Sequence, residues 1–226
     1  KSLKDARSLA EEMVSIGTLE GKDMTAVISD MDQPLGYAVG NALEVKEAIL
    51  TLQGKGPKDL EELVLVLGSY MTVKAGKAES PEEAVCMLKD SLKSGKAFQT
   101  FQEFIRAQGG DPDDAVHPER LPQAAFQEPL LSDREGYICD IHTEEVGKVC
   151  LLLGGGREKK DSPVDLSVGL VLNHKKGDYV KKGEALAVIH ANDRNRLAEA
   201  GKKLETCFEF SETRPAAEPL IKAVID

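Results

Sequence analysis

Apolar residues recur every three or four positions through most of the first half of the chain, which is the period of an amphipathic helix. Gly17 follows the first such stretch in the manner of a helix C-cap. Ser80, with Glu83 three positions later, marks a strong helix start of the capping-box type. We expect the stretch over 60–75 to be largely buried, and residues 24–28 to form a short buried strand. The predicted helices span residues 3–16, 41–52, 60–75, 81–94 and 96–108.

The pattern changes in the second half of the chain. Residues 109–134 combine adjacent glycines with four prolines and many acids, which predicts a linker or extended segment without regular elements. Beyond it, Val, Ile and Leu recur at the period-two spacing of strands. Gly177, between two polar residues, is expected to turn a hairpin. Strands are predicted over 136–141, 147–153, 164–172, 179–180 and 185–190, followed by a helix over 194–207 and an extended tail.

These elements together predict the fold class α/β (α+β). Residues 1–110 are expected to form part of a mixed α/β domain, residues 111–135 a linker, and residues 136–226 a small β-rich domain with a terminal helix. Because an amphipathic helix opens within a few residues of the first position, the α/β domain is expected to be truncated.

Composition excludes several classes of function. The 226 residues include 41% hydrophobic and 30% charged residues, which is ordinary for a globular protein. The net charge of −10 argues against DNA or RNA as a partner, and the lack of Trp removes the usual platform for base stacking. The sequence has neither an apolar run long enough for a membrane span nor a charged-then-apolar leader. A cytoplasmic protein without membrane or nucleic-acid partners is expected.

The cysteines give no sign of a metal or redox centre. No two of them form a C-x-x-C pair, so free, buried thiols in a reducing compartment are expected. His142, His174 and His190 are scattered along the predicted strands and turns, and structural roles fit them better than ligation. Lys175, Lys176, Lys181 and Lys182 flank the predicted hairpin turn and are expected to be solvated. The cysteines are Cys86, Cys139, Cys150 and Cys207.

One block of the sequence carries a specific signature. Residues 30–36 read D-M-D-Q-P-L-G, and residues 39–45 read V-G-N-A-L-E-V. This block resembles the signature of the thymidine and pyrimidine-nucleoside phosphorylases, and the resemblance spans essentially the whole chain. Other segments that resemble the family in the same order are residues 107–111, 121–122, 153–157, 165–169, 176–184 and 188–191.

The resemblance implies a function for the parent protein. Members of the family are pentosyltransferases that use phosphate to convert a pyrimidine nucleoside into the free base and a (deoxy)ribose 1-phosphate, in pyrimidine salvage. They are about twice as long as this chain and act as homodimers. The family's phosphate-binding, catalytic and base-binding motifs are not in this sequence, so no catalytic or substrate-binding residue is assigned and those residues are expected upstream of Lys1. The chain by itself is expected to be inactive, and whether the parent prefers thymidine or uridine is left open.

A structural potassium ion is the cofactor that the resemblance implies. Leu35 and Ala38 match positions that ligate it through backbone carbonyls, and Glu47 matches a position that ligates it through its carboxylate, while the remaining ligands are expected outside this sequence. Hard oxygen ligands suit such an ion. A continuous helix would separate Leu35 from Glu47 by about 18 Å. The assignment therefore requires the loop to fold back, with the helix beginning near Asn41 as its N-cap and Glu44 in a near capping box.

Two other functions are alternatives. The spacing of Gly177, Val180 and Gly183 resembles the strands of biotinyl/lipoyl carrier domains, which predicts a related barrel-sandwich. Residues 190–193 offer no lysine for the prosthetic group, which argues against a carrier. A non-enzymatic structural or interaction module is the other alternative. The glycine triplet before Arg157 fits a tight turn between strands better than an anion cradle.

Overall fold

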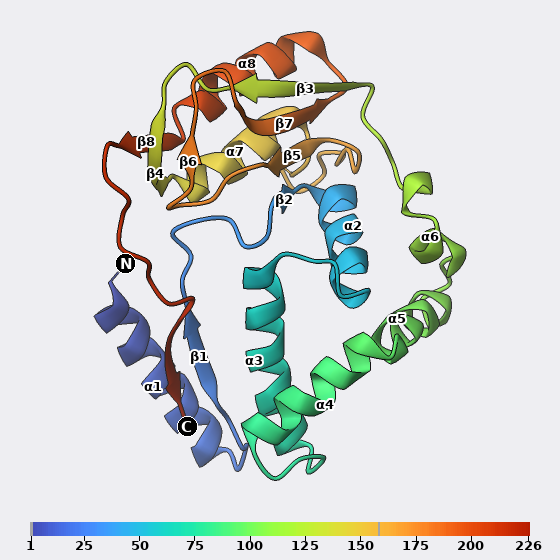
Figure 1. Ribbon diagram of the computed structural model, residues 1–226. Coiled ribbons are helices and arrows are strands. Elements are labelled where there is room, and N and C mark those ends of the chain that lie inside the picture. The colour runs from blue at the N-terminus through green and yellow to red at the C-terminus, as the bar shows by residue number, and fades with distance from the viewer. Residues whose placement is uncertain (1, 158) are drawn as a thin grey trace. The chain divides into compact units, whose positions relative to one another are not determined.

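The protein is described by a computed structural model that covers residues 2–157 and 159–226 (Figure 1). It contains both helices and strands, so the mixed α/β class is confirmed. The helices are α1 (Leu3–Leu19), α2 (Asn41–Leu52), α3 (Lys58–Lys74), α4 (Pro81–Lys93), α5 (Lys96–Ala107), α6 (Asp113–Val116), α7 (Thr143–Leu153) and α8 (Arg194–Glu205), with a 3-10 turn, η1 (Pro118–Arg120). The strands are β1 (Ala26–Ser29), β2 (Ala38–Val39), β3 (Phe126–Leu131), β4 (Gly136–Ile141), β5 (Gly169–Leu172), β6 (Tyr179–Val180), β7 (Ala185–Ala191), β8 (Phe208–Ser211) and β9 (Ile221–Ile225).

The chain forms two compact units, and both are discontinuous in sequence. The first unit contains residues 2–30, 58–97 and 218–226, and the second contains residues 31–57 and 98–217. The division into a phosphorylase-type domain, a linker and a C-terminal domain stays a prediction.

The first unit contains a two-stranded antiparallel sheet. The last strand of the chain, β9, pairs with β1 (Figure 1). In this pairing Ala26 stands opposite Ile225. Helix α1 packs against both strands. Helices α3 and α4 pack together, and they approach closely where Gly68 meets Leu88. The tail predicted as extended is thus ordered as β8 and β9, and β9 joins the end of the chain to its beginning.

The first helix is longer than predicted. Ser2 caps it, since its side chain accepts a hydrogen bond from the Asp5 N–H in a capping box. Gly17 does not end the helix, which continues to Leu19. A Cβ on Gly17 would come within 1.7 Å of the Met24 sulfur, so Gly17 serves close packing.

Helix α3 is less buried than predicted. Only Leu65 and Ser69 are buried along it, whereas Val64, Leu67 and Met71 are exposed. The run of apolar residues therefore leaves a partly exposed stripe on α3, although α4 packs against the helix. Among the described residues, no helix is long and apolar enough to cross a membrane.

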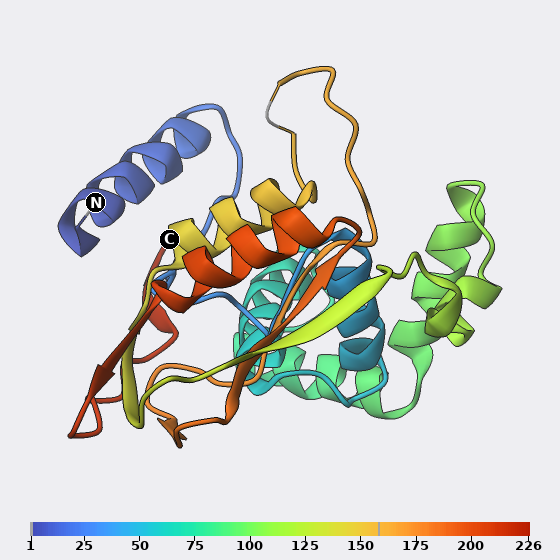
Figure 2. The same ribbon diagram turned by 90° about the horizontal axis from the view of Figure 1, so that it is seen from above.

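The second unit contains two antiparallel sheets and two covering helices. One sheet has the strand order β2-β5-β7-β3, and the other has the order β6-β4-β8. Helices α7 and α8 pack side by side (Figure 2). Their inner faces and those of the strands enclose one apolar core. Its fully buried side chains include Ile138, Ile141, Val146, Val149, Leu170, Leu172, Val180, Leu186 and Leu204.

Residues 147–153, predicted as a strand, are instead the larger part of helix α7. Val146, Val149, Cys150 and Leu153 are its buried residues, and they lie at helical rather than alternating spacing. Gly154 then ends the helix in a left-handed conformation with φ of 104°. The prediction was wrong because a short apolar run fits either period.

The turn at Gly177 does not form a hairpin. Strand β5 pairs with β2 and β7, while β6 pairs with β4 in the other sheet, so the segment between them crosses from one sheet to the other. Gly177 does adopt a positive φ of 94°. Val180, Leu186 and Ile189 point into the core as predicted, with side chains no more than 3% exposed.

The predicted linker, residues 111–135, contains regular structure. Helix α6, the turn η1 and strand β3 all lie within it. Strand β3 pairs with β7 over six positions and includes Pro129. A proline fits here because β3 is an edge strand, where one N–H need not join a ladder. The finer likeness to a biotinyl/lipoyl barrel-sandwich stays a prediction.

Candidate functional site

The loop before strand β2 folds back onto helix α2, as the sequence predicts. The Glu47 carboxylate on α2 accepts hydrogen bonds from the backbone N–H groups of Tyr37, at 2.9 Å, and Ala38, at 3.2 Å. Both bonds reach the same oxygen, Oε1. Glu47 is half-buried, and its charge is therefore held at a fixed point over the loop.

Gly36 is essential to this arrangement. It has a positive φ of 66°, and a Cβ at this position would come within 2.1 Å of Glu47 Oε2. The carbonyl of Leu35 belongs to the peptide bond that precedes Gly36. Ordinary bond lengths then keep the Leu35 carbonyl oxygen within about 6.5 Å of Glu47 Oε2. Leu35, Ala38 and Glu47 thus lie around one turn of the chain.

Helix α2 begins at Asn41, as predicted, but its cap differs from the prediction. The N-cap residue is Gly40, and no side chain caps the helix. Glu44 reaches back to accept a hydrogen bond from the Gly40 N–H, which is half of a capping box. The Asn41 side chain instead donates to the carbonyl of Gly155, in the loop after α7.

A second close contact fixes the loop from the side of the sheet. Gly40 and Gly169 face each other where β2 pairs with β5, with φ values of 140° and 153°. A Cβ on Gly169 would come within 2.3 Å of the Val39 carbonyl oxygen. Two strands approach this closely only where neither residue carries a side chain.

Lysines also anchor the loop. The Lys175 ammonium donates to the carbonyl of Pro34 and lies 5.0 Å from the centre of the Tyr37 ring. The Lys176 N–H donates to the Gln33 side chain at 3.1 Å. The prediction of solvated lysines holds for Lys181 and Lys182 but is wrong for Lys175 and Lys176, which are partly buried. No sequence signal indicated this, because the loop lies some 140 positions earlier.

A pocket of about 520 Å³ opens beside the loop. Its walls come from α2, the residues that follow α2, and the outer faces of β3, β5 and β7. His190 is half-buried there, and burial, with a smaller effect of the Lys46 charge, lowers its pKa below the usual value. A neutral imidazole beside apolar walls fits the structural role predicted for this histidine.

The glycine triplet forms the end of helix α7. Gly154 is the C-cap, and the Gly155 N–H bonds to the Cys150 carbonyl. It is a tight turn, as predicted, although it follows a helix and not a strand. The turn accounts for the glycines, and no anion ligand is needed to explain them.

Comparisons with known proteins agree with the signature block. The family model "Glycosyl transferase family, a/b domain" matches residues 1–98, and the model "Pyrimidine nucleoside phosphorylase C-terminal domain" matches residues 137–211. The pyrimidine-nucleoside phosphorylase of Geobacillus stearothermophilus is 50% identical to the chain over 221 residues. The chain belongs to the pyrimidine-nucleoside phosphorylase family.

The match is to part of the family's length. The Geobacillus alignment covers 98% of this chain but 51% of that relative. The pyrimidine-nucleoside phosphorylase of Staphylococcus aureus (strain MSSA476) is 46% identical over 226 residues, which are 100% of this chain and 52% of that relative. The chain therefore spans about half the length of the curated relatives it matches.

Proposed function

We propose that this chain supplies part of the scaffold of an enzyme that uses phosphate to cleave pyrimidine nucleosides. The observation that carries the proposal is the 50% identity to a pyrimidine-nucleoside phosphorylase across 98% of the chain. Phosphorolysis depends on positioning phosphate and on stabilising the charge that leaves with the base. The groups that do so belong, in this proposal, to the part of the family that the chain does not span. The active protein would be a cytoplasmic homodimer.

The first unit supports a scaffold role. Its sheet has two strands, and a two-stranded sheet is marginal by itself in water. Leu9, Met13 and Ile16 on α1 and Val64 and Met71 on α3 are all at least 49% exposed. Apolar helix stripes of this kind favour burial against further elements of the same α/β domain.

The carrier alternative is less well supported. The segment after β7 leads directly into α8, and Asp193 caps that helix by accepting a hydrogen bond from the Arg196 N–H. A carrier needs an exposed lysine on a hairpin there. The barrel-sandwich likeness remains part of the proposal for the fold of the second unit.

A complementation assay tests the proposed function. The chain would be co-expressed with the portion of the Geobacillus enzyme that it does not cover. Release of thymine or uracil from thymidine or uridine, in the presence of phosphate, is expected from the pair and from neither part alone. Sustained turnover by the isolated chain, or stable association of the two parts without any turnover, would count against it.

We also propose that the Leu35 and Ala38 carbonyls and the Glu47 carboxylate help to hold a structural potassium ion. The donors fit, because a carboxylate and two carbonyls from one turn are hard oxygen ligands. The ion would fix the loop and thereby the end of β2. In this proposal the ion has a structural role only.

Glu47→Gln tests the potassium proposal. Glutamine still accepts hydrogen bonds from Tyr37 and Ala38 but carries no charge. The melting temperature of the complemented protein should rise when potassium replaces sodium at equal ionic strength, because the ion binds only the folded state. That rise should vanish in Glu47→Gln and persist in the matched control Glu44→Gln. An equal potassium response in all three proteins would exclude the site.

A further inference from the structure

His142 lies between two carboxylates in the second unit. Its Nε2 is 2.9 Å from Glu209 Oε1, and its Nδ1 is 3.9 Å from Asp140 Oδ2. One ligand atom from each of the three residues lies within 4.8 Å of the other two. Together these three residues form what we call the β4–β8 cluster.

The sheet register brings the cluster together. Strands β4 and β8 are antiparallel, and Asp140 stands directly opposite Glu209. The register shifts between Ile138 and Asp140, so Ile138 points into the core while Asp140 points outward beside Glu209. The backbone N–H of His142 donates to the Cys207 carbonyl at 2.9 Å, which holds the His142 backbone beside the start of β8.

The electrostatics of the cluster favour a cation. Like charges directly opposite each other on paired strands are destabilising. Within the described residues, neither Asp140 nor Glu209 has a lysine or arginine within 4.0 Å, and His142 is the sole ion-pair partner of both. The nearest helix adds further negative charge with Glu144 and Glu145.

Two lysines of this region are paired with other carboxylates and do not neutralise the cluster. Lys148 bonds to Glu144 and Glu145, each at 2.7 Å, and Lys203 bonds to Glu145 at 3.3 Å. Both cations are therefore engaged on helices α7 and α8. Among the described residues, the carboxylates of Asp140 and Glu209 therefore have the imidazole of His142 as their ion-pair partner.

The site also has room for an ion and its water. Asp140 and His142 line an open pocket of about 690 Å³, together with three further acidic residues and one lysine: Asp32, Glu144, Glu145 and Lys176. The side chains of Asp140, His142 and Glu209 are 40%, 42% and 57% exposed, so they can rotate without disturbing the core. Ligand atoms around a tetrahedral zinc ion lie roughly 3.3–3.6 Å apart. Small side-chain rotations bring the cluster to that spacing.

From this geometry we propose that Asp140, His142 and Glu209 bind a divalent transition-metal ion of the zinc type. One imidazole nitrogen and two carboxylate oxygens suit zinc, which completes its shell with water. The bound ion removes the repulsion between the two strands. It links β4, β8 and the start of α7, and it therefore stabilises the second unit.

Calorimetric titration with zinc chloride tests the site. All proteins would carry Cys86→Ser, because an exposed thiol also binds zinc. The chain should bind one zinc ion at this site with micromolar affinity, and zinc should raise the melting temperature. His142→Gln, Glu209→Gln and Asp140→Asn should each weaken binding at least tenfold. Magnesium should bind far more weakly, since it prefers an all-oxygen octahedral shell.

A matched control distinguishes the cluster from an ordinary histidine–carboxylate pair. His117 Nδ1 lies 3.0 Å from Glu119 Oε1, with no second carboxylate in an ion pair with His117 among the residues described. His117→Gln should leave zinc binding unchanged. Without metal, Glu209→Gln should melt no lower than the parent, because it relieves the repulsion between Asp140 and Glu209. With that result, a loss of zinc binding in Glu209→Gln is not caused by a folding defect. Equal zinc affinity in His142→Gln, or magnesium binding as tight as zinc, would overturn the proposal.

Discussion

The two units of the chain use apolar residues in opposite ways. In the second unit, the large side chains on α7, α8 and both sheets converge on one core and are almost completely buried. In the first unit, the helices have similar apolar periodicity, but their buried residues are few and include the small Ala10 and Ala84. The second unit closes its own core, whereas the first leaves apolar stripes on α1 and α3 in solvent. Periodicity thus shows that a face is apolar but not what covers it.

Matched leucine substitutions should show the largest difference between the units. Leu170, in β5, is fully buried, and Leu170→Ala should lower the free energy of unfolding by about 2–5 kcal/mol. Leu9, on α1, is 59% exposed, and Leu9→Ala should change it by no more than about 0.5 kcal/mol. Urea denaturation of the isolated chain measures both.

The two leucine substitutions also extend the comparison of the two units to the complemented protein. If further elements of the α/β domain cover α1, the cost of Leu9→Ala should rise above its value in the isolated chain. An unchanged, small cost would show that the α1 stripe remains in solvent and would remove one support for the scaffold role.

Glycine substitutions should give a smaller difference. Gly169→Ala should cost about 2–4 kcal/mol, because its new Cβ meets the Val39 carbonyl and its φ of 153° disfavours a side chain. Gly21, in the first unit, has a φ of 71° but nothing within 4 Å of an added Cβ. Gly21→Ala should therefore cost only the backbone strain, about 1–2 kcal/mol. Equal melting temperatures for the two variants would contradict the close approach of β2 and β5.

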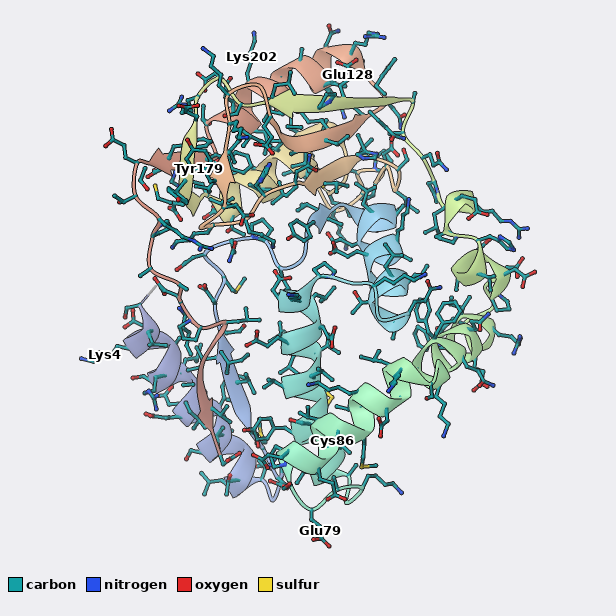
Figure 3. The ribbon with its side chains drawn as sticks, viewed as in Figure 1. Lys4, Glu79, Cys86, Glu128, Tyr179 and Lys202 are labelled. Atoms are coloured by element: carbon teal, nitrogen blue, oxygen red, sulfur yellow. The ribbon has the colours of Figure 1, made fainter. Side chains whose placement is uncertain are left out.

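Thiol reactivity should give the smallest effect, which is kinetic rather than energetic. Burial, with nearby Glu44 as a lesser cause, raises the pKa of the Cys150 thiol to about 11. Burial, with nearby Glu145 as a lesser cause, raises the pKa of Cys207 to about 11. Cys86 is exposed on α4 of the first unit (Figure 3). Peptide mapping after brief alkylation near pH 8 should find Cys86 modified roughly 100-fold faster than either buried thiol.

The same pKa shifts predict a pH dependence. Because the folded state raises both pKa values from about 9 to about 11, the buried neutral thiols stabilise folding fully below pH 9. That stabilisation is lost as the pH rises from 9 through 11. Cys150→Ala with Cys207→Ala should flatten the fall in melting temperature over this range. Rapid labelling of Cys150 at pH 8 would show that the second unit opens easily.

The sequence alone determined the local elements that carry their own signals. Helix α2 begins at Asn41 as predicted, because glycines on one side and a helical apolar pattern on the other mark that boundary. Ser80 caps α4 as predicted. The signature block over residues 30–45 identified the family by resemblance. Each of these depends on residues within a few positions of one another.

Only the tertiary structure decided which distant segments meet. Three contacts illustrate this: β9 pairs with β1, Lys175 contacts Pro34, and His142 lies between Asp140 and Glu209. No sequence pattern indicated that these residues would meet. Residues 147–153 became helical because the period of a short apolar run is ambiguous until the surrounding core selects one. Local sequence sets the propensity of each segment, while burial of apolar surface between segments selects the partners.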